Sequence, residues 1–136
     1  LDVTSDIDYS RAMASATFEQ KDFAIELYND QGEKLVGGFD AGNNQFYINR
    51  GAAGRNEFSE SFNALLIAPR ISDDEKITVT FVADVSSLEI FFDDGLTVLT
   101  SLYFPDEPLS KMRIKSPGGM TVQDFRVAQL ESVWRD

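Results

Sequence analysis

The sequence predicts an all-β protein: a two-layer antiparallel β-sandwich of the concanavalin or jelly-roll type. Apolar and polar residues alternate in about ten short segments, which is the pattern of strands with one buried face. Turn-forming residues separate these segments at intervals of about eight to twelve residues, as in sandwich folds. The chain has 136 residues and eleven phenylalanines, enough for one aromatic core. We therefore expect a single sandwich domain over residues 1–136.

The clearest pattern lies in the middle of the chain. Apolar residues alternate with threonines over 77–81, and a second alternating run covers 88–92. The Asp-Gly pair at 94–95 suits a tight hairpin, because both residue types tolerate a positive φ. A third run over 98–104 ends at a proline, which cannot donate to a strand ladder. These runs predict three consecutive antiparallel strands.

The N-terminal part is predicted to hold one strand and one hairpin. Residues 2–9 alternate between an apolar-leaning face and an acidic face, which predicts a first strand. Residues 11–20 contain several alanines without a helix cap, so we expect a loop there. Residues 23–27 and 34–40 flank a four-residue turn and form a hairpin. Gly37-Gly38 in the returning strand indicates a bulge or a close backbone approach.

Four further segments complete the predicted sandwich. Residues 45–50 form a strand with Phe46 and Ile48 on one face and Tyr47 on the other, and residues 64–69 form an apolar strand that ends at a proline. Residues 111–115 alternate apolar and basic side chains. Residues 121–130 form a long final strand whose alternation changes phase near Asp124, which predicts a bulge there.

Composition excludes several classes of function. A net charge of −11 argues against binding to nucleic acids or anionic membranes, which need clustered basic residues. The longest apolar run, residues 64–69, is too short to span a membrane. Without histidine or cysteine the chain cannot form the usual nucleophile triads or zinc sites, and we expect no cofactor or metal. The acidity favours a secreted or periplasmic location, and the alternating pattern at the very start is typical of a domain cut from a longer polypeptide.

Four acidic residues are the candidates for a catalytic carboxylate pair of the kind that glycosidases use. They are Asp84, Glu89, Asp93 and Asp94. Asp93 and Asp94 fall in the predicted hairpin turn, where backbone geometry selects Asp, so we expect no catalytic role. Glu89 lies within a strand and is expected to form a structural ion pair.

A sandwich could also bind sugar through aromatic side chains with a few polar groups beside them. The stacking candidates are Tyr28, Tyr47, Tyr103 and Trp134, and the polar candidates are Asn49, Arg50 and Glu89. The alternative is that the aromatics fill the core. We predict a ligand site formed by Tyr47, Asn49, Arg50 and Glu89. Calcium binding at 73–75 or at Asp6 and Asp8 would need oxygens from distant loops, so a solvated acidic face is favoured there.

Four motifs together resemble one family, the C-terminal β-sandwich domain of glycoside hydrolase family 32, which includes levanases, inulinases and invertases. The first is the strand Asn44-Gln45-Phe46-Tyr47-Ile48-Asn49-Arg50, and the second is Ala68-Pro69. The third is Phe81-Val82-Ala83-Asp84-Val85-Ser86-Ser87-Leu88-Glu89-Ile90-Phe91. The fourth is Asp94-Gly95 followed by Leu99-Thr100-Ser101-Leu102-Tyr103-Phe104-Pro105. The sequence departs from the family pattern at three places. Leu65-Leu66 stands where the family has an Arg-His pair, Asn49 stands where it has an Asp, and Val85 stands where it has an Arg.

The resemblance implies a non-catalytic role. In this family, catalysis belongs to a five-bladed propeller that precedes the sandwich, and its three catalytic motifs are Trp-Met-Asn-Asp-Pro-Asn-Gly, Arg-Asp-Pro and Glu-Cys. None of them occurs in this chain. The implied partner is thus the catalytic propeller of the same parent protein, with fructan or fructose as a further ligand.

The function predicted from the sequence is that of an accessory domain in a fructan-active glycoside hydrolase. The alternatives are a free-standing carbohydrate-binding module and, third, an enzyme in its own right. An exposed apolar patch around residues 65–67 would favour the accessory domain, because it would mark the surface that docks on the partner.

Overall fold

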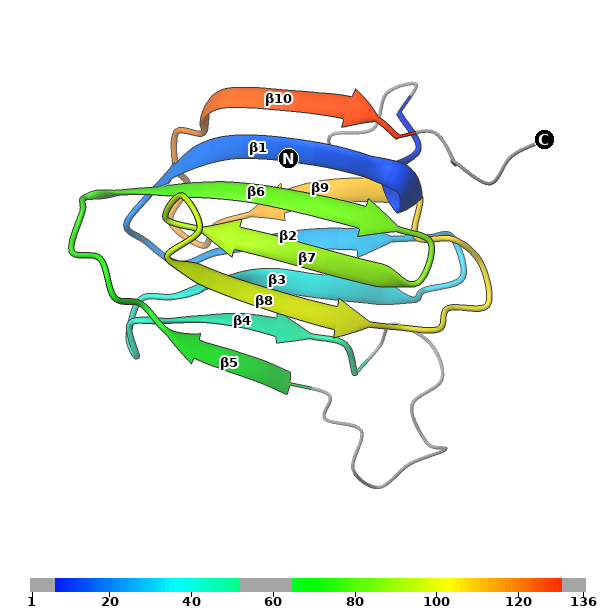
Figure 1. Ribbon diagram of the computed structural model, residues 1–136, viewed down its shortest axis with the longest axis horizontal. Coiled ribbons are helices and arrows are strands. Elements are labelled where there is room, and N and C mark those ends of the chain that lie inside the picture. The colour runs from blue at the N-terminus through cyan, green and yellow to red at the C-terminus, as the bar shows by residue number, and fades with distance from the viewer. Residues whose placement is uncertain (1–6, 52–64, 131–136) are drawn as a thin grey trace.

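The computed structural model describes residues 7–51 and 65–130, which form two packed antiparallel sheets of five strands each (Figure 1). The only helical element in these residues is a short 3-10 turn at Tyr9–Arg11. The predicted all-β sandwich is therefore confirmed. No helix in the described ranges is long and apolar enough to cross a membrane.

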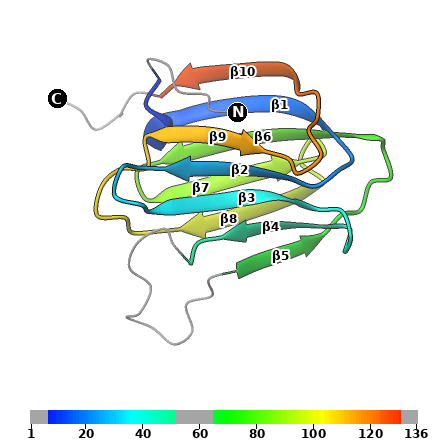
Figure 2. The ribbon, with the colours of Figure 1, turned by 180° about the vertical axis from the view of Figure 1, so that it is seen from behind.

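Sheet A has the strand order β5-β4-β3-β2-β9. Its strands are β5 (Leu65–Pro69), β4 (Gln45–Asn49), β3 (Lys34–Asp40), β2 (Phe23–Tyr28) and β9 (Lys111–Lys115). Sheet B has the order β10-β1-β6-β7-β8. Its strands are β10 (Gln123–Gln129), β1 (Ala12–Glu19), β6 (Lys76–Asp84), β7 (Ser87–Phe92) and β8 (Thr97–Leu102). The view from behind shows sheet A in front and the edge strands β5 and β8 along the same side of the sandwich (Figure 2).

The core lies between the sheets and is built by strict alternation. In β6, for example, Ile77, Val79 and Phe81 are buried while the residues between them are partly exposed. A row of phenylalanines links the two layers, since the ring centroids of Phe46 in sheet A and Phe92 in sheet B are 4.0 Å apart in a stacked arrangement. Such aromatic contacts add to the free energy gained from burial alone.

The N-terminal prediction is wrong in one respect. Residues 11–20, expected to form a loop, contain the eight-residue strand β1, which pairs with both β6 and β10. Ala12, Ala14 and Ala16 all face inward and are buried. Alanine has a low intrinsic preference for strands, but pairing on both sides and burial of one face outweigh that preference. The strand predicted at residues 2–9 falls largely outside the described residues, and its end belongs to the 3-10 turn.

Irregular strand geometry was predicted at Gly37-Gly38 and near Asp124, and the structure shows a bulge only at the second position. Gly37 and Gly38 mark a close approach without a bulge, because the β2–β3 register is continuous and a Cβ on Gly38 would lie 2.1 Å from the Phe23 carbonyl oxygen. The bulge predicted near Asp124 is confirmed. The β1–β10 register shifts there, and Asp124 adopts a φ of 56°.

A buried ion pair fastens one end of the sandwich. The Arg70 guanidinium follows β5 and donates to both carboxylate oxygens of Asp93, at 3.0 and 3.2 Å, and both side chains are almost fully buried. Asp93 opens the four-residue turn between β7 and β8 and has a φ of 55°. Asp93 is thus selected both for the turn and for its pairing with Arg70, which ties an edge of sheet A to a turn of sheet B.

Candidate functional site

A groove crosses the outer face of sheet A. Strand register places Lys115, Ala24, Gly38, Tyr47 and Ile67 side by side in one row across the five strands. Ala24 carries only a methyl group and Gly38 has no side chain, so the sheet surface is lower at these two positions than at Lys115 and Tyr47. The groove has a volume of about 440 Å³, within the range of small-molecule sites.

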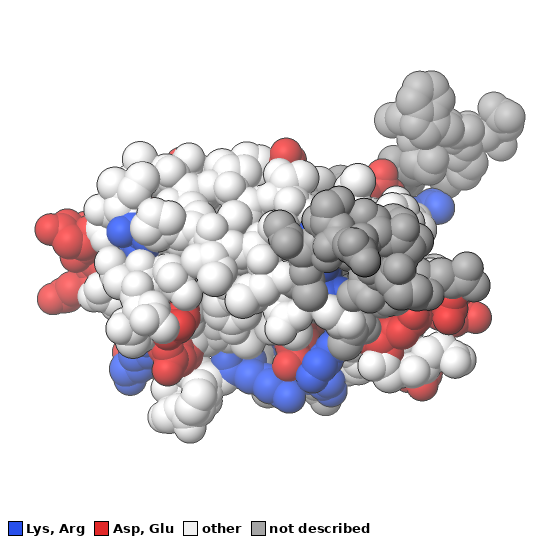
Figure 3. Space-filling model, turned by 90° about the horizontal axis from the view of Figure 1, so that it is seen from below, with Lys and Arg blue, Asp and Glu red and all other residues white. Residues whose placement is uncertain are grey.

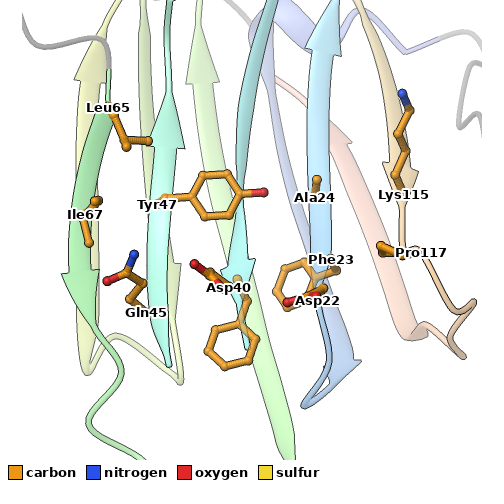
Figure 4. A pocket seen from close by; sticks show the side chains of 11 residues that line it. Asp22, Phe23, Ala24, Asp40, Gln45, Tyr47, Leu65, Ile67, Lys115 and Pro117 are labelled. Atoms are coloured by element: carbon orange, nitrogen blue, oxygen red, sulfur yellow. The ribbon is translucent and has the colours of Figure 1, made fainter. Parts of the chain in front are cut away.

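Tyr47 supplies the aromatic surface of this groove. Its side chain leaves β4 and extends over β3 towards Ala24, and its ring is seen face-on in the view onto the sheet (Figure 4). Gly38 lies beneath it in the register and adds no side chain of its own. One face of the Tyr47 ring is therefore turned away from the sheet.

Three polar residues lie at one end of the groove. They are Asp22, before β2, Asp40, at the end of β3, and Gln45, at the start of β4. Asp22 Oδ1 accepts a hydrogen bond of 2.7 Å from the backbone N–H of Ala41, and Asp40 Oδ2 accepts one of 2.8 Å from the Asn43 amide. These bonds fix the orientation of both carboxylates before any ligand arrives.

The remaining hydrogen-bonding groups of the groove are available. Within the described ranges, the Gln45 amide and the Tyr47 hydroxyl form no side-chain hydrogen bond to the protein. Burial, and then the nearby charges of Asp22, Asp40 and Glu26, raise the pKa of Tyr47. The hydroxyl therefore keeps its proton at neutral pH and can donate it to a ligand.

An ion-pair cluster lies beside the groove and includes its lining residue Lys115. The buried carboxylate of Glu26 accepts from Arg113 Nε at 2.6 Å and lies 3.5 Å from Lys115 Nζ. Arg113 also lies over the Tyr28 ring, with its guanidinium carbon 4.1 Å from the ring centroid. Because Glu26 occupies these cations, the groove is not an open basic patch.

The arrangement suits a neutral, hydroxyl-rich ligand better than catalysis. An aromatic face packs against the apolar side of a sugar, carboxylates accept hydrogen bonds from its hydroxyls, and the amide and the tyrosine donate to its oxygens. Neither histidine nor cysteine is present in the chain to act as a nucleophile or base. Among the described residues, no group of three or more acidic side chains is placed to hold a metal ion.

The structure brings together only part of the predicted ligand site. Tyr47 and Asn49 share the outer face of β4, and Asn49 is exposed while its side chain accepts from the N–H of Gly51. Arg50 turns towards sheet B, where its Nη1 donates to Ser101 Oγ and to the Leu102 carbonyl oxygen at 3.3 Å. Glu89 lies on the outer face of sheet B between Val82 and Thr100, so it cannot join Tyr47.

The other aromatic candidates have different surroundings. Tyr103 is buried in the core, and its hydroxyl donates to the carbonyl oxygens of Asp84 and Ser87 at 3.3 Å. Burial raises the pKa of Tyr103 well above its ordinary value. Tyr28 lies under Arg113 outside the groove, and Trp134 lies outside the described residues.

The acidic candidates are structural or exposed. The ion pair expected for Glu89 is wrong: within the described ranges Glu89 has no cationic partner, and the buried carboxylates that form ion pairs belong to Asp93 and Glu26. Asp94 accepts from the Thr78 hydroxyl at 3.1 Å, while Asp8 caps the 3-10 turn by accepting from Ser10. Asp6 lies outside the described residues.

Sequence analysis missed the residues that surround Tyr47. Asp22, Asp40, Gln45 and Lys115 come from separate strands and turns, so no local motif contains them. The available signal was the pair of small residues at outward positions, Ala24 and Gly38, which become neighbours only when the strand order and register are known.

A second surface lies along the edge strands β5 and β8 and shares Leu65 and Ile67 with the groove. Leu65 and Ile67 on β5 are 49% and 50% exposed and point outward from sheet A, while Val98 and Leu102 on β8 are 44% and 53% exposed and point outward from sheet B. We call these four residues the β5–β8 edge. Viewed from this side, a large part of the visible surface of the described residues is uncharged, and most acidic and basic side chains lie towards its two ends and its lower border (Figure 3). Exposed apolar side chains on two neighbouring edge strands are typical of an interface.

Comparisons with known proteins agree with the fold. The family model described as "Glycosyl hydrolases family 32 C terminal" matches residues 1–131. The chain is 30% identical over 116 residues to the levanase of Bacillus sp. (strain L7), covering 85% of this chain and 13% of that protein. It is 30% identical over 125 residues to the extracellular exo-inulinase inuE of Aspergillus ficuum, covering 88% of this chain and 23% of that protein. The crystal structure of exo-inulinase from Aspergillus awamori superposes with a TM-score of 0.82 at 25% identity, over 98% of this chain and 27% of that one. The chain thus spans less than a quarter of the two curated relatives.

Proposed function

Since this chain belongs to the glycosyl hydrolases family 32 C-terminal domains, we propose that it is the non-catalytic accessory domain of a fructan-active glycoside hydrolase. Its role is to dock on the catalytic propeller of the parent protein and stabilise it. The small share of each relative that the chain covers supports a role as one domain among several.

The β5–β8 edge is the observation that carries this proposal. Leu65 and Ile67 are half exposed, whereas Leu66 between them packs against the core. A strand of this kind presents apolar side chains to solvent at a sheet edge, where unpaired backbone groups already favour association. A partner domain seated here would cover both the apolar side chains and the open strand edge.

The docking role is tested by grafting. This chain replaces the matching 116 residues of the Bacillus sp. (strain L7) levanase, and the temperature of thermal inactivation is measured. Leu102→Lys on β8 should lower it by about 2 °C or more, because a charge enters the interface. Met13→Lys is the control: Met13 is 43% exposed on β1 of the same sheet, away from the edge. Equal effects of the two variants, or a chimera no more stable than the levanase without any such domain, would contradict the proposal.

The non-catalytic part of the proposal has its own test. The isolated chain is incubated with levan, inulin and sucrose, and released fructose is assayed. We expect no release, and hydrolysis by the purified chain would favour the alternative of a stand-alone enzyme.

A further inference from the structure

We propose that the groove around Tyr47 is a sugar-binding site that holds a short segment of a neutral oligosaccharide, with the Tyr47 ring as its platform. The choice of fructan as that oligosaccharide rests on the proposed function, whereas the site itself rests on the geometry of sheet A.

The Tyr47 ring lies beside small residues of the neighbouring strands, and its outer face is open. Tyr47 is flanked in register by Gly38 on one side and by Ile67 on the other. Ala24 on β2, next in the row, is also small, so no large side chain fills the space beyond the tyrosine hydroxyl (Figure 4). A sugar unit can lie on the ring with its edge over β2.

Polar groups of the groove are placed to meet the edge of a ligand that lies on the Tyr47 ring. Asp22, Asp40 and Gln45 lie together at one end of the groove, and their strands and turns hold them there before binding. Pre-oriented acceptors lose little conformational entropy on binding. Carboxylates and an amide are the groups that distinguish hydroxyl orientations, so they would provide specificity while the ring provides contact area.

The charges that line the groove favour a neutral ligand. Lys115 is the cation that lines the groove, and it is placed against Glu26. Two carboxylates at the other end make the groove unfavourable for an anionic ligand. A neutral sugar, in contrast, brings no charge of its own that would be buried without a partner.

The site is tested by NMR titration of the ¹⁵N-labelled chain with levan oligosaccharides and inulin oligosaccharides, with maltooligosaccharides as the comparison. We expect amide shifts confined to residues around Ala24, Gly38, Gln45 and Tyr47. Affinity should be unchanged between low and high salt, because no net charge is neutralised. Shifts elsewhere, or none with any sugar, would overturn the site. Binding of maltooligosaccharides alone would overturn the assignment to fructan.

Variants separate the platform from the rest of the sheet. Tyr47→Ala should weaken binding at least about tenfold, as expected for removal of a central aromatic contact. Tyr28→Ala, on the same outer face but outside the groove, should leave affinity unchanged. Ala24→Val fills the floor without removing a polar group and should also weaken binding. Equal affinity of Tyr47→Ala and Tyr28→Ala, with dispersed spectra for both, would overturn the proposal.

Failure of this inference can be told apart from failure of the proposed function. The titration uses the isolated chain and variants that line the groove, whereas the grafting test uses Leu102, which lies on the other sheet. Loss of the sugar site would leave the docking result standing.

Discussion

Glu26 is a buried carboxylate that neighbouring cations stabilise. It sits on the outer face of sheet A and yet is only 5% exposed, because Arg113 and Lys115 cover its carboxylate. Burial by itself would raise the pKa of Glu26, but the hydrogen bond from Arg113 and the charges of Lys115 and Lys34 outweigh it, so the pKa is lowered. A carboxyl group whose pKa is lower in the folded than in the unfolded chain stabilises the fold wherever it is ionised.

The expected pH dependence of this stabilisation follows in sign from the lowered pKa. The contribution of Glu26 is fully present above the ordinary glutamate pKa of 4.5 and is lost as the pH falls through the lower folded value. Glu26→Gln should therefore reduce the free energy of unfolding by about 1.5–3 kcal/mol at pH 7, the range for a hydrogen bond to a charged group. The reduction should shrink below pH 4.5.

Urea denaturation at several pH values measures this effect. Glu89→Gln is the matched control, because Glu89 is also mid-strand but exposed and without a cationic partner in the described ranges. A reduction for Glu26→Gln that does not vary with pH, or that equals that of Glu89→Gln, would refute this account of Glu26.

At the scale of elements, the β2–β3 pair depends on the absence of one side chain. Gly38 faces Ala24 in the ladder, and a Cβ built on it would lie 2.1 Å from the Phe23 carbonyl oxygen. That atom belongs to a backbone held by sheet A and cannot rotate away as a side chain could. The strands could accept an alanine only by moving apart locally, which would also displace Tyr47 from its place beside Gly38.

Gly38→Ala should destabilise the chain by about 1–3 kcal/mol, the usual cost of a group forced into a packed site. Gly118→Ala serves as the comparison, since a Cβ there meets nothing within 4 Å and its φ is not positive. Thermal unfolding followed by circular dichroism measures both. Similar melting temperatures for the two variants would show that the β2–β3 pair tolerates the added methyl group.

At the scale of the whole molecule, charge and apolar surface act against each other. A net charge of −11 keeps copies of the chain apart, while the exposed side chains of the β5–β8 edge favour contact. Only the first effect is screened by salt. Which effect wins therefore depends on ionic strength.

The isolated chain should be monomeric at low salt and should self-associate near 0.5 M NaCl, an ionic strength at which the screening length falls to about 4 Å. Leu102→Lys should stay monomeric under both conditions, even though the added lysine lowers the net negative charge. Met13→Lys carries the same charge change away from the edge and should associate like the parent chain. Sedimentation velocity distinguishes these cases, and association of all three chains to the same extent would place the contact elsewhere.

The sequence by itself determined the class of fold and most strand positions. In segments such as 77–81 and 45–49 an apolar residue occupies every second position, and a period of two residues can bury one face only in a strand. It also indicated the tight approach at Gly37-Gly38 and the bulge at Asp124. The strand β1 could not be predicted, because alanine has a low preference for strands and the pairing with β6 and β10 that stabilises this strand is not visible in the sequence.

Tertiary structure alone decided the composition of the groove and of the β5–β8 edge. Tyr47 and Asn49 could be assigned to one face from the sequence, but whether Glu89 joined them depended on which sheet received β7. Likewise, Asp22 and Lys115 are far apart in the chain and line the same groove only because β9 pairs with β2. The physical reason is that alternation along a strand is a local property, whereas strand order is set by how both sheets together bury their apolar faces.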